Sequence, residues 1–389
     1  MHTPRFFRGA SCVLVIAFAA HSQAALRYRV TVLSNLDGEK YTTATAISDA
    51  GHIAGNSGQM GVFWPEPEAP PEMITGQGDN CNQVTGVNSS GIVTGITGEG
   101  FAAYRWHSGS DLEVLDGTAI CCPRAEGIND EGIIVGRVHF LGSGDHAAVW
   151  SADIAVNLGG APGDAASIAL DISNNGQIVG RTWNTAARWV NGQAETLAGL
   201  AGNFSFANGV NNRGEIVGEK EASGPQAWSR PFHWFNGKVT ELPLLGGFYG
   251  FAHAINDDGL IVGMATVSTG IAINRATLWR NGKAIDLNDR TVNLPLNMRL
   301  SVAYDINASG MIVGAAENEA FELFGFFLAP LPPADINIDG QVNVSDLLAV
   351  ISGWGQCAAG VLCDADVVED GQVNVNDLLA VIGAWGSID

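Results

Sequence analysis

A ten-residue pattern of apolar, polar and glycine positions recurs seven times between about residue 40 and residue 330. It consists of a small residue, Ile or Val, Asn or Ser, two variable residues, Gly, a variable residue, Ile or Val, a small or β-branched residue, and Gly. The copies occupy 46–55, 86–95, 127–136, 171–180, 209–218, 254–263 and 305–314, with closing glycines 38 to 51 residues apart. Repeats of this period indicate an array of one supersecondary unit.

Each unit is predicted to consist of short β-strands. Two β-branched stretches flank an Asn-x-x-Gly turn, as at 256–259, where Asn begins the turn and Gly takes the positive φ. A tryptophan follows in six units, and the seventh has Phe326 and Phe327 instead. The tryptophans are Trp64, Trp106, Trp150, Trp189, Trp234 and Trp279. Because nearly every unit requires one, we expect them to pack between units rather than to bind a ligand.

Four strands per repeat are typical of a propeller blade, so the predicted fold class is an all-β seven-bladed β-propeller over residues 25–328. The seventh unit runs directly into a Pro-rich segment, 329–334, which we interpret as a linker. It leaves no room for a fourth strand there, whereas residues 28–36 resemble the fourth strand of other units. We expect this N-terminal strand to complete the seventh blade and close the ring. An open array, or a ring of six or eight blades, is the alternative.

The repeats resemble the HAF extracellular repeats of secreted bacterial proteins, which are named for a His-Ala-Phe string before the tryptophan. His146-Ala147-Ala148-Val149-Trp150 is the nearest match, and the other units keep mainly the apolar-x-Trp part. The resemblance implies an extracellular location and almost no biochemistry.

The last 55 residues contain a different repeat. Residues 335–346 place oxygen-bearing side chains at loop positions 1, 3, 5, 9 and 12, with glycine at position 6 and a backbone carbonyl at position 7. A twelve-residue loop of this kind surrounds Ca²⁺, which takes about six to eight oxygen ligands. The expected ligands are Asp335, Asn337, Asp339, Gln341, Asn343 and Asp346. An apolar segment with helical spacing follows the loop.

A second loop, 366–377, repeats this pattern less completely. Its expected ligands are Asp366, Asp370, Gln372, Asn374 and Asp377, whereas Val368 occupies position 3 and offers no side-chain oxygen. We therefore predict two bound Ca²⁺ ions, the second held more weakly, because affinity follows the charge and number of the ligands. The alternative is a pair of Asx-rich turns before amphipathic helices, with no ion.

Residues 335–389 resemble a type I dockerin module, a pair of calcium-loop-plus-helix units, in a bacterial variant with Gly-Trp-Gly endings. The resemblance implies a small α-helical module that docks onto a cohesin-like or other extracellular anchoring protein, often in polysaccharide breakdown. It places partner contacts at loop positions 10 and 11, which are Val344, Ser345, Val375 and Asn376. Only Ser345 is a small hydroxyl residue of the kind usual there, so the partner's identity stays open.

Composition indicates the compartment. Residues 1–24 have the basic start, apolar run and small-residue end of a secretory signal peptide. No other stretch is long enough for a membrane span, so we expect a secreted protein. The formal net charge of −21 makes nucleic acid a poor partner.

Five cysteines follow the signal segment, and an oxidising compartment permits disulfides. Cys357 and Cys363 could close a small loop, and Cys81 could pair with Cys121 or Cys122.

The sequence contains no recognisable catalytic motif: a nucleophile elbow, a His-Glu-x-x-His helix and a phosphate-binding loop are all absent. Acidic residues of the repeats lie mainly in the turns, so no catalytic residue is predicted. We expect a non-catalytic binding or display protein, with a ligand site in the longer loops at 219–233 or 264–275. The alternatives are an enzyme or carbohydrate-binding accessory in extracellular polysaccharide catabolism, whose partner would be a polysaccharide, and a self-assembling surface protein.

Overall fold

The computed structural model describes residues 26–75, 83–97, 102–115, 121–140, 144–151, 154–161, 163–164, 166–200, 204–222, 228–268, 272–357, 363–368 and 370–387. They divide into a propeller unit, Arg27–Leu331, and a C-terminal unit that begins at Pro332. The signal peptide predicted at 1–24 lies outside this range. Within the described part of the chain, no helix is long and apolar enough to cross a membrane.

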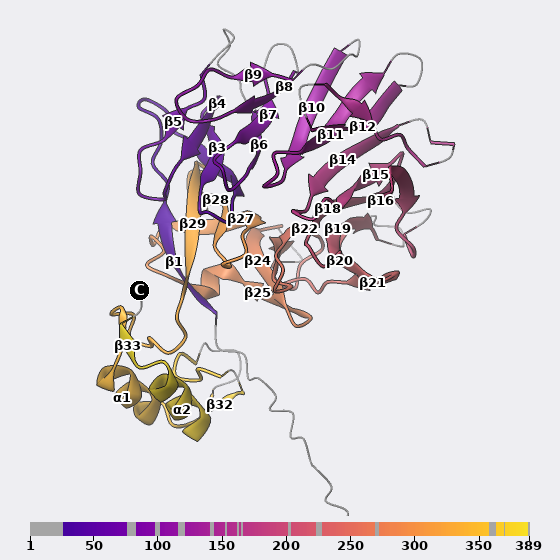
Figure 1. The fold of residues 1–389 in the computed structure, drawn as a ribbon. Helices are drawn as coiled ribbons and strands as arrows, with labels where there is room; N and C mark the ends of the chain where they lie inside the picture. Colours follow the sequence, from indigo (N-terminus) through magenta and orange to yellow (C-terminus); the bar gives the residue numbers. More distant parts are fainter. Residues whose placement is uncertain are drawn as a thin grey trace, which may run out of the picture. The chain divides into compact units, whose positions relative to one another are not determined.

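The propeller unit consists of seven antiparallel sheets that follow one another around a central axis (Figure 1). Blades 1 to 3 are β2 Thr42–Ile47, β3 Ile53–Ser57, β4 Met60–Trp64 and β5 Glu72–Met73; β6 Gln83–Val87, β7 Val93–Ile96, β8 Ala103–Trp106 and β9 Glu113–Val114; and β10 Cys121–Ile128, β11 Ile134–Phe140, β12 Gly144–Trp150 and β13 Val156–Asn157. Blades 4 to 6 are β14 Ser167–Ile172, β15 Ile178–Thr182, β16 Thr185–Val190 and β17 Gln193–Thr196; β18 Ser205–Val210, β19 Ile216–Glu221, β20 Ser229–Phe235 and β21 Lys238–Glu241; and β22 Gly250–Ile255, β23 Ile261–Thr266, β24 Asn274–Arg280 and β25 Lys283–Asp286. The predicted seven-bladed propeller is confirmed.

Blade 7 combines the two ends of the propeller unit. Its strands β27 (Met298–Ile306), β28 (Ile312–Asn318) and β29 (Leu323–Leu331) are completed by the N-terminal β1 (Arg27–Val32). Strand β1 is antiparallel to β29, and in Figure 1 the indigo β1 lies beside the orange β29. The predicted closure of the ring is therefore confirmed. Strand β29 includes the first three residues of the segment interpreted as a linker.

A fifth strand in blade 7 was not predicted. Strand β26 (Thr291–Val292) follows the short 3-10 helix η1 (Leu287–Arg290) and pairs with β1 in parallel. It covers the outer edge that β1 would otherwise expose to pairing with another chain.

The repeated phrase forms the hairpin between the two innermost strands of each blade. In blade 6 the Gly259 N–H donates to the Asn256 carbonyl at 3.0 Å, and Gly259 has φ +74°. The Asn256 side-chain oxygen accepts the N–H groups of Asp258 and Leu260. The turn therefore satisfies its own backbone, which is the reason for Asn at its start.

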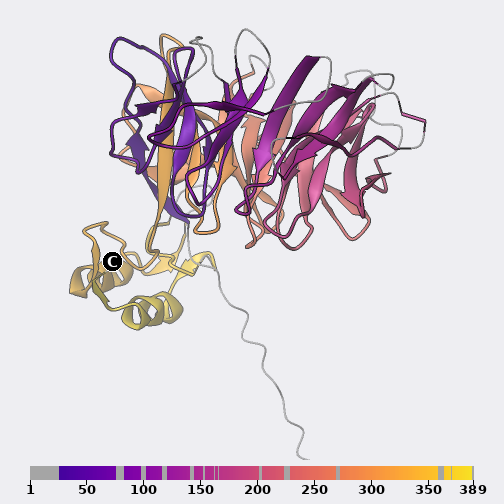
Figure 2. The ribbon, with the colours of Figure 1, turned by 45° about the horizontal axis from the view of Figure 1, so that its top comes forward.

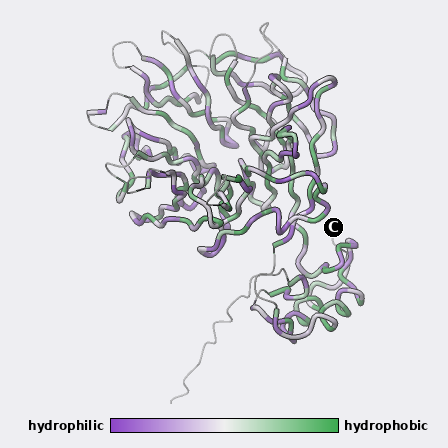
Figure 3. The backbone as a smooth tube through the Cα atoms, turned by 180° about the vertical axis from the view of Figure 1, so that it is seen from behind, coloured by the Kyte–Doolittle hydropathy of each residue, from purple (hydrophilic) through white to green (hydrophobic). Residues whose placement is uncertain are grey.

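Hydrophobic side chains of neighbouring sheets form the core between blades. Hydrophobic and hydrophilic segments alternate along the propeller strands in Figure 3, as a sheet with alternating faces requires. All six repeated tryptophans are buried, which confirms their predicted packing role. Figure 2 shows the blade strands running between two faces of this unit.

The C-terminal unit contains two short helices, α1 (Val344–Ser352) and α2 (Val375–Gly383). Each loop is paired with the segment after the other helix: β30 (Gln341–Val342) with β33 (Gly386–Ser387), and β31 (Gly355–Gln356) with β32 (Gln372–Val373). The small core between them is mainly valine, from Val342, Val350, Val367, Val373 and Val381. A disulfide joins Cys357 to Cys363. Cys81 and the side chains of Cys121 and Cys122 lie outside the described part of the structure.

Candidate functional site

A ring of hydrogen bonds between blades surrounds the central channel at the Asn-x-x-Gly turns. Wherever the third position of the phrase is Asn, its Nδ2 donates to the carbonyl at the third position of the next blade, at 3.0–3.3 Å. These bonds join Asn88 to Asn129, Asn129 to Ser173, Asn211 to Asn256, Asn256 to Asn307, and Asn307 to Ser48. The recurrent asparagine therefore has two roles: it forms the turn within its own blade, and it bonds to the next blade.

Acidic turn residues belong to the same ring. Asp49, Asp130 and Asp257 accept the backbone N–H groups of Ala308, Ser89 and Asn212, each on a neighbouring blade, at 2.7–2.8 Å. They are structural groups, as their place in the turns suggested.

The channel itself is a cavity of about 260 Å³ lined by the innermost strands and turns of all seven blades. The wall carries the carboxyl side chains of Asp49, Glu126, Asp130, Asp171, Asp257 and Asp305. No lysine or arginine is among the residues that line it. The channel is therefore a strongly acidic cavity.

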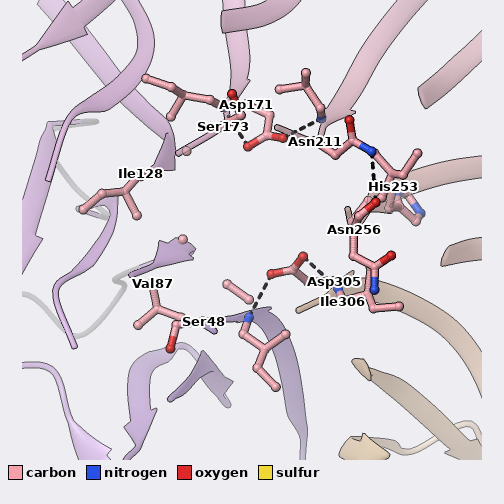
Figure 4. A pocket seen from close by; sticks show the side chains of 18 of the residues that line it. Ser48, Val87, Ile128, Asp171, Ser173, Asn211, His253, Asn256, Asp305 and Ile306 are labelled. Atoms are coloured by element: carbon pink, nitrogen blue, oxygen red, sulfur yellow. Dashed lines mark hydrogen bonds between the residues drawn. The ribbon is translucent and has the colours of Figure 1, made fainter. Parts of the chain in front are cut away.

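Two of these carboxyls are unlike the others because they begin the repeated phrase. Blades 4 and 7 have Asp171 and Asp305 there, whereas the other five blades have Gly or Ala. Figure 4 shows both side chains facing the same open space from different strands. From the repeat pattern, this position was expected to hold only a small residue, and no site was predicted there. The signal that was missed is that two of seven copies carry an acid where a small residue is the rule.

Each of the two carboxylates bridges neighbouring blades. Asp171 accepts the N–H of Ile172 in its own strand and that of Val210 in blade 5, both at 2.8 Å. Asp305 accepts its own Ile306 N–H and the Ile47 N–H of blade 1, again at 2.8 Å. Asp305 thus lies at the junction where the last blade meets the first.

Burial raises the pKa of both carboxyls above the usual value for aspartate, to about 6 for Asp171 and about 7 for Asp305. In each case the two backbone N–H donors oppose this rise. The charges of Asp171 and Asp49 raise the pKa of Asp305 further. The two channel carboxyls therefore interact electrostatically.

These pKa values predict a pH dependence. Asp305 binds a proton more tightly in the folded than in the unfolded chain, so its contribution to stability is present below about pH 4 and is lost as pH rises to about 7. The stability difference between wild type and Asp305→Ala should shift in favour of the variant by on the order of 4 kcal/mol across this window. Urea denaturation at several pH values measures the difference, and a pH-independent difference would contradict it. Alanine stands at the equivalent position in blades 1 and 6, so the fold accommodates it.

Aromatic rings extend from the channel across blade 6. Tyr304 and His253 line the cavity, with ring centroids 5.7 Å apart. His253 lies 6.4 Å from Phe251, Phe251 lies 5.9 Å from Tyr249, and Tyr249 stacks on the exposed Trp228 at 5.6 Å. Part of the expected ligand loop, 219–233, thus contributes to an aromatic path. Residues 223–227 and 269–271 of the two expected loops lie outside the described structure.

In the first loop of the C-terminal unit, the carboxylates at positions 1 and 12 are both buried. Asp335 accepts the N–H groups of Asp339 and Gly340. Asp346 accepts those of Ile336, Asn337 and Asn343. Because Ile336 directly follows Asp335, these bonds bring the two ends of the loop together.

Helix capping accounts for part of this arrangement. Asn343 is the N-cap of α1, and its side chain forms a reciprocal capping box with Asp346. Asn374 and Asp377 do the same for α2. This agrees with the alternative of Asx-rich turns without an ion, so capping by itself does not distinguish the two interpretations.

The second loop repeats the geometry. Asp366 accepts the N–H groups of Asp370 and Gly371, and Asp377 accepts those of Val368 and Asn374. Burial raises the pKa of Asp366, and the neighbouring charges of Asp377 and Asp370 raise it further, against the Gly371 and Asp370 N–H donors. Three carboxylates therefore lie within electrostatic reach, while Val368 contributes only backbone.

The remaining expected ligands are exposed or half-buried. Asn337 and Asp339 bond to each other through Nδ2 and Oδ2, and Asn374 donates to Asp370. Gln341 and Gln372 lie in β30 and β32, where only their backbone carbonyls are expected to serve. In the described residues, no group of three or more His, Cys, Asp or Glu side chains has an arrangement that could hold a metal ion. The expected calcium ligands also include amide oxygens of asparagine and backbone carbonyl oxygens, which are not among these four side-chain types.

Charge balance in the C-terminal unit favours a cation. From Pro332 to Asp389 the sequence has nine Asp and Glu residues and no Lys, Arg or His. Asp335, Asp346, Asp366 and Asp377 are buried there, and buried charges are normally paired or bound to a metal. With no basic side chain in the unit, the residues present fit a hard cation with oxygen ligands.

The two helices expose a repeated row of apolar side chains. Along α1 and just beyond it these are Val344, Leu348, Ile351 and Trp354, and along α2 they are Val375, Leu379, Ile382 and Trp385. Trp354 is 54% exposed and Trp385 53%. The predicted contact residues Val344, Ser345, Val375 and Asn376 are also exposed. The resemblance had placed partner contacts only in these first helical residues, and the longer row was not predicted.

Comparison with known proteins gives similarity in fold only. No protein-family model and no curated protein matches the chain. The extracellular domain of a putative hybrid two-component system from B. thetaiotaomicron is 10% identical with a TM-score of 0.48, over 77% of this chain and 39% of that one. A streptogramin B lyase is 12% identical with a TM-score of 0.47, over 78% of this chain and 98% of that one. A B. thetaiotaomicron protein of unknown function is 10% identical with a TM-score of 0.41, over 79% and 77%.

Proposed function

We propose that this chain is a secreted, non-catalytic binding protein, which is attached through its calcium-loaded C-terminal unit to an extracellular partner and displays the propeller there. The observation that carries this proposal is the repeated apolar row on α1 and α2. Its members recur at i, i+4, i+7 and i+10, so each row follows one face of its helix. The second row repeats the first after 31 residues.

The exposure of these side chains supports docking. Eight large apolar residues, including two tryptophans, are exposed in a unit with a core of only a few valines. A concentration of apolar side chains on a small surface marks an interaction site, and tryptophan is enriched among the residues that dominate binding energy. An acidic unit without basic residues suits a partner with an apolar groove and a basic rim.

Calcium supplies the positive charge that the buried loop carboxylates lack. Asp335, Asn337, Asp339, Asn343 and Asp346 would hold the first ion, with the Gln341 carbonyl. Asp366, Asp370, Asn374 and Asp377 would hold the second with the Gln372 carbonyl, more weakly because Val368 has no side-chain oxygen. When bound, the ion neutralises the repulsion among the carboxylates. The loops in turn fix the starts of α1 and α2 through the capping boxes, so calcium binding and presentation of the apolar rows are coupled.

A charged residue in either apolar row should disrupt docking. With Leu348→Glu and Leu379→Glu combined, recovery of the partner from the native secretome should fall by at least about tenfold. Each change removes an exposed leucine that docking would bury and would instead bury an unpaired charge in the complex. The measurement is a pull-down with the full chain in calcium and in chelator. Ile154→Glu, at an exposed apolar position of the propeller, is the matched control.

Partner recovery that survives both the double variant and the chelator would contradict the proposal. Calcium-dependent dimers in sedimentation velocity, with no other protein recovered, would instead support the self-assembling alternative.

The alternative that the chain is an enzyme is supported by two carboxyls in one channel but not by their pKa values. Asp171 and Asp305 place two carboxyls on one channel, as glycoside hydrolysis requires. Their pKa values are both raised, to about 6 and about 7, whereas an acid and base pair needs environments that separate them. Release of reducing sugar from a glycan by the wild type, and its loss in Asp305→Asn, would favour the enzyme over the binding protein.

A further inference from the structure

We propose that the central channel of the propeller binds a small primary ammonium group, held by the carboxylates of Asp171 and Asp305 and by the side chains of His253 and Tyr304. This inference concerns the propeller unit and does not depend on docking by the C-terminal unit. It assigns a ligand class to a cavity that the proposed function leaves without one.

The two carboxylates are not needed to close the ring. Five of the seven blades have Gly or Ala at the same position, and their junctions form through the turn ring and through side chains such as Thr45 and Thr85, which donate to the next blade. Blades 4 and 7 add a half-buried carboxyl group where a small residue suffices. Each carboxylate oxygen accepts one N–H, and an ionised carboxylate has about four lone-pair sites. Each aspartate can therefore accept further donors from the channel.

Two further polar side chains face the cavity without a protein partner. His253 and Tyr304 line the channel, and within the described part of the chain they make ring contacts only, with no hydrogen bond to protein. Burial lowers the pKa of His253 to about 4, so its imidazole is neutral near pH 7 and has one nitrogen that accepts a hydrogen bond. Both side chains are half-buried in the cavity wall, so each is open to a partner that enters the channel.

The charge of the wall identifies the donor as a cation. Six carboxyl side chains line the cavity, and no lysine or arginine does. A bound cation would stabilise the ionised forms of Asp171 and Asp305, which burial disfavours. An anion or a second acidic group would add to the repulsion.

The aromatic rings favour an organic ammonium over a bare metal ion. The described residues provide no group of three or more metal-ligating side chains arranged for a metal. His253 and Tyr304, which both line the cavity, instead bring two rings with centroids 5.7 Å apart to its wall, and aromatic rings attract ammonium groups. Three N–H donors on one nitrogen suit acceptors on several sides of the cavity.

Calorimetric titration of the full chain tests the proposal without any variant. We expect n-butylammonium to bind at least about tenfold more tightly than 1-butanol, which lacks the charge, and than tetramethylammonium, which lacks N–H donors. Equal affinity for the three probes, or no binding, would overturn the proposal. Nα-acetyl-lysine methylamide separates two sources of the group: affinity equal to that of n-butylammonium indicates a lysine side chain of a polypeptide, and weaker binding indicates a free amine.

Variants locate the site. Asp171→Gly and Asp305→Ala introduce the residues that other blades carry, and each should weaken n-butylammonium binding at least about tenfold, with no measurable binding in the double variant. His253→Leu keeps a bulky side chain at this position but removes the acceptor nitrogen, and should weaken n-butylammonium binding severalfold. Glu195→Gln, which removes an exposed charge on outer strand β17 of blade 4, should leave binding unchanged. Unchanged binding in the folded double variant would place the ammonium elsewhere and overturn the assignment.

Discussion

Replacing Asp335 and Asp346 together by alanine is expected to abolish the proposed stronger calcium site. Both carboxylates are buried, and the bonds from Ile336 and Asn337 to Asp346 bring loop positions 1 and 12 together. Their loss removes two charged ligands from one loop, and affinity follows ligand charge and number, so calcium affinity there should fall by about a hundredfold or more. The measurement is calorimetric titration of the full chain, in which the tighter of two binding events disappears.

Asp346 also caps α1, so its loss has a structural effect besides any effect on calcium. Asp335→Asn separates the two, because Asp335 is not part of the capping box of α1. Asparagine removes the charge and one of the two oxygens that accept the Asp339 and Gly340 N–H groups, and leaves Asp346 in place. This variant should weaken the first site while the helix content of the calcium-loaded chain stays unchanged. Asp364→Asn removes a charge outside the ligand positions and is the matched control. Persistence of both binding events in the double alanine variant would show that the ligand assignment is wrong.

Trp64→Ala is expected to destabilise the propeller by about 3–5 kcal/mol. Trp64 is completely buried and packs in one cluster with Leu33, with Val313 and Phe327 of blade 7, and with other residues of blade 1. Its Nε1 donates to the Ser34 carbonyl at 3.2 Å. The side chain therefore fills the core at the junction where the ring closes, and alanine would leave a cavity there. Urea denaturation followed by circular dichroism measures the loss.

Two further variants serve as comparisons for the stability loss of Trp64→Ala. Trp64→Phe keeps most of the apolar volume and removes the indole donor, so it should cost about 1–2 kcal/mol. Trp183→Ala removes a tryptophan that is 59% exposed and should change stability by no more than about 0.5 kcal/mol. A Trp64→Ala variant as stable as Trp183→Ala would mean that the ring does not depend on its closing junction.

An ammonium group bound in the channel would give the propeller a binding function of its own, besides the display of a surface. A propeller that only displays a surface needs no special chemistry at its axis. Asp171, Asp305, His253 and Tyr304 instead bring carboxylate, imidazole and phenol groups to one cavity. If that cavity holds an ammonium group, the C-terminal unit would bring an amine-binding propeller to the partner.

The repeat pattern alone was sufficient to predict the propeller, because its elements are local. The Asn-x-x-Gly turn closes within four residues, and the recurrence of tryptophan marks an interior position before any coordinates are known. The pairing of β1 with β29 was also predictable, since one unit lacked a strand and the N-terminus supplied one. The two helices of the C-terminal unit were predictable for the same reason, because the apolar residues after each loop recur at helical spacing along the chain. Their capping boxes were seen only in the structure.

The tertiary structure decided which residues of different blades meet. Asp171 and Asp305 are separated by 134 positions in the sequence, and His253 belongs to a third blade, so no local spacing joins them. Only the closing of seven sheets around one axis brings their side chains to a single cavity and removes them from water, which raises the pKa values of the aspartates. Likewise, the sequence showed that both tail helices carry apolar residues, but only the packed unit showed which of them the valine core leaves exposed. Burial and proximity across the ring depend on the whole fold, whereas turns, caps and repeats depend on neighbours in the chain.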